Sequence, residues 1–254
     1  MLYYIKKGEG RNIVLLHGFL ENSKMWSKFQ KELSKDNCVI SIDLPGHGKS
    51  AAETKETNRM EYIADKINEV LEFLEVKEAI LMGHSMGGYV ALAFADNYRH
   101  KTSGLGLLFS TALPDSDAKK EQRLKAAELV VKNPQEFFRL TVPALFVQEN
   151  LPATQKEVEE AVSWANETSP AGAAASAKGM RLRPDRVEVI RNLNKPVLIL
   201  AGDKDKSLQV DELKKAVVDC ENLTFAELPT GHMGVIEMPE ESLLVVKDWL
   251  RKNF

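Results

Sequence analysis

The stretch "ILMGHSMGGYVALAF", residues 80–94, places one small polar residue, Ser85, between two apolar segments. The run before Ser85 predicts a buried strand, and the run from 87 to 98 predicts a helix. A serine at a sharp strand-to-helix turn projects its hydroxyl clear of the sheet, and Gly83 and Gly87 avoid side-chain collisions across the turn. The helix N-terminus adds free backbone N–H groups near the hydroxyl. The pattern therefore predicts a nucleophile beside an anion site, with a tight structural turn as the alternative.

Short apolar runs alternate with longer amphipathic runs on both sides of this stretch. The near-continuous apolarity of the short runs fits a parallel sheet that is covered on both faces. We expect strands at 12–18, 38–44, 79–85, 104–111, 196–203 and 223–229, and helices at 23–35, 59–76, 87–98 and 239–254. These elements predict an α/β protein with a mostly parallel twisted sheet.

The strand signal stops after Thr111 and returns only at Pro196. The residues between are helix-like, rich in Ala, Glu, Lys and Arg, and interrupted by prolines. We therefore expect a core made of residues 1–111 and 195–254, with an inserted all-helical cap at residues 112–194. A second helical layer with no role in binding is the alternative.

The overall composition argues against several classes of protein. The chain has 254 residues and a formal net charge of −3, with no basic stripe interleaved with aromatics, so nucleic-acid binding is not expected. No apolar run has membrane-spanning length and the start lacks a signal core, so we expect a cytoplasmic protein without membrane association. Cys38 and Cys220 lack metal-ligand spacing and are expected to be free thiols. No cofactor and no metal is implied, and the oligomeric state is left open.

An activated serine needs a base and an acid, which should follow it in the order Ser, acid, His. His232, in "LPTGHMGVIEMP" after the last strand, is the candidate base. "LILAGDKDKS" offers Asp203 and Asp205, and we favour Asp205 because it lies further along the loop towards His232. The acid would hold the imidazole in the correct tautomer and stabilise its charged form. Asp203 is the alternative acid; otherwise we expect its carboxylate to accept hydrogen bonds from loop amides.

The oxyanion formed during acyl transfer needs two donors. The backbone N–H of Met86, directly after the nucleophile, is the first candidate. The N–H of Phe19, in the loop "LLHGFLENS", is the second because Gly18 permits close approach of the backbone. We expect His17 to brace this loop rather than to take part in the chemistry.

Apolar residues of the insertion are candidates for an acyl pocket. The candidates are Phe137, Phe138, Leu145, Phe146, Val147 and Trp164, with packing between cap helices as the alternative for each. Met86 and Met233, which flank the triad, are the stronger candidates. We expect Met233, Phe138 and Trp164 to bind substrate. The arginines Arg123, Arg139, Arg181, Arg183 and Arg186 could select an anionic substrate, although solvated helix faces explain them more simply.

Taken in order, "LLHGF" (15–19), "DLPGHGKS" (43–50), "GHSMGG" (83–88), "GDKD" (202–205) and "GHM" (231–233) resemble the α/β-hydrolase superfamily over nearly the whole chain. The return from the insertion is similar to that of esterase and enol-lactonase-like members. The resemblance implies a Ser85–Asp205–His232 triad, an oxyanion hole at Phe19 and Met86, and a helical cap over an apolar pocket.

The function expected from this resemblance is a serine esterase, acting on carboxylic esters of small or medium acyl length and possibly on lactones, with a small-molecule ester as its partner. The fold supports many chemistries. A lyase that uses the same triad for proton abstraction, or a ligand-binding receptor with a residual hydrolase site, are the alternatives.

Overall fold

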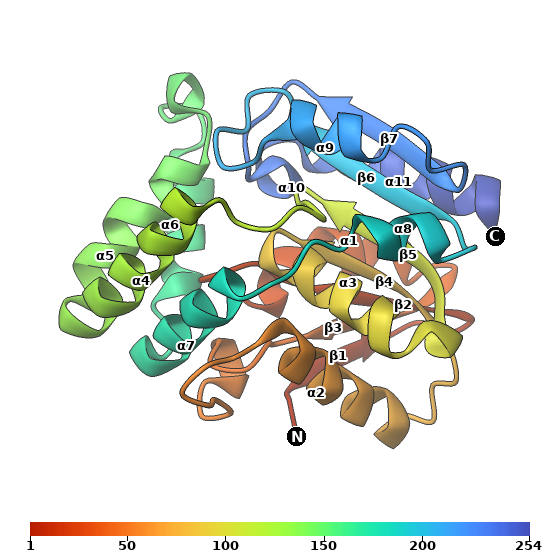
Figure 1. Cartoon of the computed structure of the whole chain (residues 1–254), viewed down its shortest axis with the longest axis horizontal. Helices are drawn as coiled ribbons and strands as arrows, with labels where there is room; N and C mark the ends of the chain where they lie inside the picture. Colours follow the sequence, from red (N-terminus) through yellow and green to blue (C-terminus); the bar gives the residue numbers. More distant parts are fainter.

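The computed structural model describes all 254 residues and is built on one seven-stranded sheet (Figure 1). The strand order is β1-β3-β2-β4-β5-β6-β7, and every pair is parallel except β1 with β3. The strands are β1 (Tyr4–Lys7), β2 (Arg11–Leu16), β3 (Asn37–Ile42), β4 (Ala79–His84), β5 (Thr102–Leu108), β6 (Val197–Gly202) and β7 (Leu223–Leu228). The predicted α/β architecture is confirmed, while the short antiparallel edge strand β1 is an element that the sequence did not reveal.

Side chains of the central strands alternate between two apolar layers, as the two-residue period of a strand requires. In β2, Val14 and Leu16 point into one layer, and Ile13 and Leu15 point into the other. The first layer is covered by α2 (Met60–Phe73), α3 (Met86–Asn97) and α9 (Val210–Ala216), and the second by α1 (Ser27–Leu33) and α11 (Pro239–Asn253). Burial on both faces explains why the strands read as continuous apolar runs.

The segment 112–194 contains helices and no strand. Four of its helices lie together at one side of the sheet in Figure 1. They are α4 (Asp117–Lys132), α5 (Pro134–Thr141), α6 (Gln155–Ala165) and α7 (Pro170–Arg181). The fifth, α8 (Val187–Asn192), instead packs on α3, and its Val187, Val189 and Ile190 belong to the first apolar layer. The chain therefore rejoins the core packing a few residues before β6.

The small residues "AGAAASA" (171–177) of α7 include Gly172, which packs closely against the loop of the "DLPGHGKS" motif. A side chain at Gly46 would place its Cβ 2.4 Å from the Cα of Gly172. Gly46 also has φ = +86°, a conformation that favours glycine. The Ser169 N–H donates to the Gly46 carbonyl at 3.0 Å. This motif thus joins the core to the helical segment, and its His47 is fully buried.

The two cysteines form no cross-link in this architecture. Cys38 in β3 and Cys220 after α9 are both buried free thiols. None of the helices combines the length and the apolar character needed to cross a membrane.

Candidate active site

Ser85 occupies the turn between β4 and α3 in a strained backbone conformation. Its φ of +49° and ψ of −115° are unusual for a residue with a side chain. The turn is fixed because the Ser85 N–H donates to the Leu108 carbonyl at 3.1 Å and the Ser85 carbonyl accepts from the Ser110 hydroxyl at 2.7 Å. Because these two hydrogen bonds keep the backbone in its strained conformation, the Ser85 hydroxyl is held in one place.

The glycines around Ser85 are required by close approach of other backbone. A Cβ on Gly83 would lie 2.1 Å from the carbonyl carbon of Gly87. A Cβ on Gly87 would lie 2.2 Å from the carbonyl oxygen of Leu16 in β2. Both contacts are with backbone, which cannot move aside as a flexible side chain would. The motif therefore lets α3 begin directly against the sheet.

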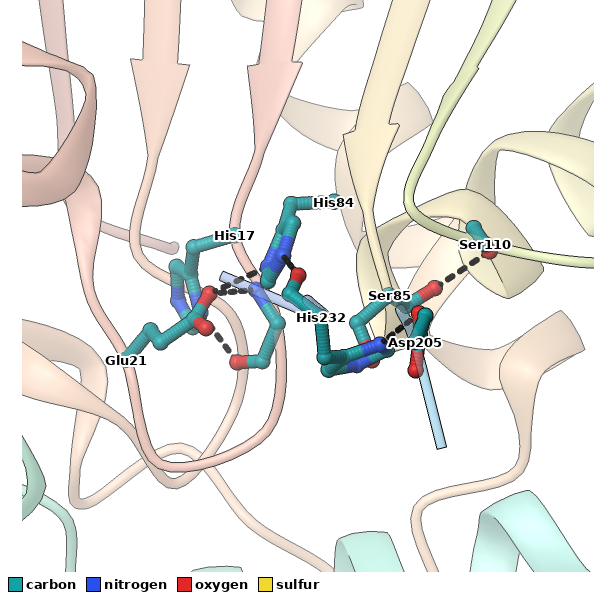
Figure 2. Close-up of polar contacts among 8 residues, drawn as sticks. His17, Glu21, His84, Ser85, Ser110, Asp205 and His232 are labelled. Atoms are coloured by element: carbon teal, nitrogen blue, oxygen red, sulfur yellow. Dashed lines mark hydrogen bonds and ion pairs between the residues drawn. The ribbon is translucent and has the colours of Figure 1, made fainter. Parts of the chain in front are cut away.

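Ser85, His232 and Asp205 form one continuous hydrogen-bonded chain (Figure 2). His232 Nε2 lies 2.7 Å from Ser85 Oγ, and His232 Nδ1 lies 2.7 Å from Asp205 Oδ2. Burial would raise the pKa of Asp205, but the charge and hydrogen bond of His232 outweigh burial and lower it overall. An ionised Asp205 accepts a hydrogen bond from the Nδ1–H group, which keeps that proton on Nδ1 and leaves Nε2 free to accept the Ser85 proton.

The two aspartates of the loop after β6 have different surroundings. Asp205 is 8% exposed, and its second carboxylate oxygen accepts the Ser207 N–H at 2.7 Å. Asp203 is exposed, and its carboxylate makes no hydrogen bond, although we had expected it to accept from loop amides. The structure therefore brings Asp205, and not Asp203, to the imidazole.

Two backbone N–H groups near the Ser85 hydroxyl have no acceptor in the protein. Phe19 lies in the loop after β2, and its N–H makes no hydrogen bond within the chain. Met86 is the first residue of α3, where an N–H has no partner inside the helix. These are the two donors that the sequence analysis placed at the oxyanion.

A second polar network, which the sequence analysis missed, contacts the backbone carbonyl of His232. His84 Nδ1 lies 3.0 Å from Glu21 Oε2, and His84 Nε2 lies 2.9 Å from the backbone oxygen of His232 (Figure 2). Both partners are acceptors, so both ring nitrogens of His84 must carry a proton and the ring is positively charged. Glu21 Oε2 also accepts the Gly18 N–H, which links the network to the Phe19 loop.

The charges of this pair stabilise each other in a fully buried position. Burial would lower the pKa of His84, but the Glu21 carboxylate raises it overall. Burial would raise the pKa of Glu21, but the His84 charge lowers it overall. The only sequence signal for the pair was an acidic residue in the otherwise apolar "HGFLE", together with the histidine before Ser85.

His17 braces the same loop as a neutral ring, as expected. Its Nε2 accepts the Leu44 N–H at 2.8 Å, and its Nδ1 lies 2.8 Å from the Gly18 oxygen. Burial lowers the pKa of His17, which fits a ring with one donor and one acceptor nitrogen.

Ser85 and His232 open into a cavity of about 260 Å³. One wall, the sheet wall, comes from α3 and from loops that follow parallel strands: Phe19, Leu20, Glu21, Ser85, Tyr89, Ser207, Leu208 and His232. The opposite wall, the helical wall, comes from the inserted segment: Lys119, Gln122, Arg123, Ala126, Phe137, Thr141 and Leu145. A site outside the carboxyl ends of parallel strands is the usual place for a ligand in an α/β sheet.

The residues expected to bind substrate lie elsewhere. Phe138, Trp164 and Met233 are at most 4% exposed, belong to the second apolar layer and do not line this cavity. They were selected for their hydrophobicity, and such side chains gain most from full burial in the core. Two other candidates from the insertion, Phe137 and Leu145, do line the cavity, and the Leu145 carbonyl also accepts the His232 N–H at 3.2 Å.

Comparison with known proteins places the chain in a family. A family model described as alpha/beta hydrolase fold matches residues 11–185. A thermophilic esterase from Thermogutta terrifontis shares 32% identity and a TM-score of 0.93, covering 99% of this chain and 93% of the other.

Two curated relatives show how varied the similar proteins are. The dihydrolipoyllysine-residue acetyltransferase component of the acetoin cleaving system of Pseudomonas putida is 30% identical over 97% of this chain, which spans only 65% of that protein. A putative 2-succinyl-6-hydroxy-2,4-cyclohexadiene-1-carboxylate synthase of Bacillus subtilis is 27% identical over 97% of this chain and 94% of its own length. The family model, the sheet order and the T. terrifontis esterase agree, and the chain belongs to the α/β-hydrolase family.

Proposed function

We propose that this hydrolase cleaves carboxylic esters of small molecules through an acyl-enzyme on Ser85. One observation carries the proposal: Ser85 Oγ and Asp205 Oδ2 each lie 2.7 Å from opposite nitrogens of His232. This is the arrangement that activates a serine for acyl transfer, because the imidazole can take the hydroxyl proton while the carboxylate stabilises the charged ring.

The reaction uses these groups in two steps. Ser85 Oγ attacks the ester carbonyl as His232 Nε2 takes its proton, and the N–H groups of Phe19 and Met86 hold the oxyanion. His232 then gives the proton to the leaving alcohol. A water molecule attacks the acyl-enzyme by the same route, which releases the acid and restores Ser85.

The helical segment acts as a cap in this proposal. Its α4 and α5 supply the wall that faces Ser85, and the Leu145 carbonyl holds the His232 backbone. The cavity of about 260 Å³ falls below the ~300–1,000 Å³ of pockets for drug-sized ligands, so short acyl groups are favoured over long ones.

The first test is hydrolysis of p-nitrophenyl esters from acetate to decanoate by wild type and Ser85→Ala. We expect turnover to be highest for the short esters and to fall by about 10⁶-fold in Ser85→Ala. The variant should retain the wild-type unfolding midpoint. Turnover that survives in Ser85→Ala would contradict the proposal.

Proton abstraction by the same triad is the second candidate, and one of the similar proteins is named as a synthase rather than as a hydrolase. In that case His232 would remove a carbon-bound proton and the N–H groups of Phe19 and Met86 would stabilise the enolate. A protein that eliminates from a β-substituted acid faster than it hydrolyses any ester would favour this candidate.

A further inference from the structure

The helical wall presents a polar face of one helix to the cavity. Lys119, Gln122, Arg123 and Ala126 of α4 are spaced i, i+3, i+4 and i+7, so they share one side of that helix. All four line the cavity that holds Ser85 and His232. The face is cationic, although the chain as a whole has a net charge of −3.

The same face continues into a second cavity beside the first. Lys119 and Arg123 line both cavities, as do Tyr89 and Ser207. The charged groups that line the second cavity are four cations and one anion: Lys119, Arg123, Arg183, Lys206 and Asp115. Positive charge is therefore in excess along the route that leads from Ser85.

The single carboxylate is already saturated by the two arginines. Asp115 Oδ1 forms an ion pair with Arg183 Nη2 at 2.8 Å, and Asp115 Oδ2 accepts from Arg123 Nε at 3.2 Å. Arg183 is structural, because it also donates to the carbonyls of Leu113 and Met180 and lies over the Tyr89 ring. Arg123 uses only Nε, so its two terminal nitrogens have no acceptor within the chain.

The Lys119 ammonium has neither an ion-pair nor a hydrogen-bond partner within the chain, although the residue is half-buried and lines the cavity. Burial and the nearby Arg123 lower the pKa of Lys119, which is the direction expected for an ammonium that lacks a counter-charge. An ordinary solvated lysine extends into water, whereas this side chain faces a cavity. Two cationic groups with free donors therefore border the reactive serine.

We propose that the substrate carries a carboxylate in addition to its ester, and that Lys119 and the terminal nitrogens of Arg123 bind that carboxylate. The inference rests on the proposed ester hydrolysis and narrows its substrates to anionic esters. Arg123 offers a planar pair of donors and Lys119 a mobile point charge, a combination that suits a carboxylate. The charged group would lie on the helical wall while the ester carbonyl lies at the sheet wall.

The test compares matched anionic and neutral esters at low, fixed ionic strength. Monoethyl succinate and ethyl butyrate differ by a carboxylate on the acyl side, and 4-acetoxybenzoate and 4-acetoxybenzamide differ by one on the alcohol side. We expect wild type to prefer the anionic member of at least one pair. In Lys119→Gln the ratio of kcat/KM for that pair should fall about ten- to hundredfold, as for loss of a charge-assisted hydrogen bond.

Two further variants separate this role from a general effect of charge. Lys125 lies on the same helix but is exposed and unpaired, so Lys125→Gln should leave both rates unchanged. Lys119→Arg should keep most of the preference. Wild-type ratios within threefold of unity in both pairs, or equal losses for both members in Lys119→Gln, would overturn the inference.

Failure of the proposed function gives a different result. If no ester is hydrolysed, the ester assignment fails, and binding of succinate measured by calorimetry then decides the inference. Succinate that binds wild type at least tenfold more tightly than Lys119→Gln supports an anion site. Absent or equal binding overturns it.

Discussion

The two walls of the reactive cavity are held in place in different ways. On the sheet wall, His232 is fixed by four hydrogen bonds, two on its ring and two on its backbone. On the helical wall, the Lys119 ammonium makes none, Arg123 donates only from Nε, and the Phe137 ring contributes only apolar contact. Groups that move protons need a fixed geometry, whereas groups that contact the rest of a substrate can tolerate adjustment.

The difference suggests that reaction type and substrate choice are encoded on opposite walls. The sheet wall is built from α3 and from loops after β2, β6 and β7, and its Glu21, Ser85 and His232 side chains make buried polar contacts. The helical wall is built from α4, α5 and the turn at Leu145. Substitutions on the first wall should lower turnover of every ester, and those on the second should change the ranking of esters.

The largest loss of activity from a substitution near the sheet wall is expected at the acid of the triad, Asp205. Asp205→Asn removes the acceptor that fixes the His232 tautomer, so kcat should fall by about 10⁴-fold for all esters. Asp203→Asn is the matched control, since it lies two residues away with an exposed, unbonded carboxylate and should change kcat by about twofold at most. Steady-state kinetics on p-nitrophenyl acetate measures both.

The reverse ranking, with Asp203→Asn the more damaging variant, would move the acid to Asp203. Equal and small effects would show that His232 does not depend on either carboxylate. In that case the sheet wall would not be the fixed side of the cavity.

The next prediction compares two neighbouring residues of α5, one expected to affect stability and the other substrate binding. Phe138 is 2% exposed and packs in the second apolar layer, so Phe138→Ala should lower the free energy of unfolding by about 3–5 kcal/mol. Phe137 lines the cavity, so Phe137→Ala should cost about 1 kcal/mol and should mainly change KM. Urea denaturation followed by ester kinetics tests the pair. A larger loss of stability in Phe137→Ala would mean that the helical wall is itself part of the core.

This pair also shows what could and could not be predicted from the sequence. The strands and the turn at Ser85 follow from local patterns, because a buried parallel strand and a strained turn constrain residue types strongly. The pairing of His232 with Asp205 rested instead on the expected order Ser, acid, His, which left Asp203 as an alternative. Phe138, Trp164 and Met233 were wrongly placed in the pocket, because hydrophobicity marks burial and not the surface of a cavity. The cationic face of α4 has the same composition as a solvated helix face. It can therefore be recognised only from its position beside the cavity in the folded structure.

Glu21 and His84 escaped prediction for a related reason. They are separated by 63 residues, and their contact depends on the β2 and β4 loops meeting behind His232. Neither a glutamate nor a histidine alone indicates an ion pair. The pair can be recognised only when the structure shows that both side chains are buried and in contact.

The smallest expected effect on activity comes from removing the charge of the Glu21–His84 pair, which tests how much this ion pair stabilises the sheet wall. In Glu21→Gln, an amide nitrogen at the Oε2 position can donate to a neutral His84, whose other nitrogen still donates to the His232 carbonyl, but the Gly18 N–H then loses its acceptor. The pair loses its charges and the Gly18 loop loses one hydrogen bond, while His232 keeps its backbone contact, so we expect kcat to fall by less than tenfold. We expect the free energy of unfolding to fall by about 1–3 kcal/mol. Glu56→Gln, an exposed and unpaired site, is the control.

The pH dependence of that loss distinguishes a charge pair from simple packing. The pKa of His84 is raised above its ordinary 6.5, so its contribution is complete below pH 6.5 and is lost as pH rises through the folded-state pKa. The pKa of Glu21 is lowered from 4.5, so its contribution is present above pH 4.5 and is lost as pH falls through its folded-state pKa. In Glu21→Gln, burial without a counter-charge should lower the pKa of His84, which destabilises the variant further below pH 6.5. The difference in unfolding free energy should therefore be largest between about pH 4.5 and 6.5 and should shrink towards alkaline pH. A difference that stays constant from pH 5 to 9 would show that Glu21 supports the site by shape alone.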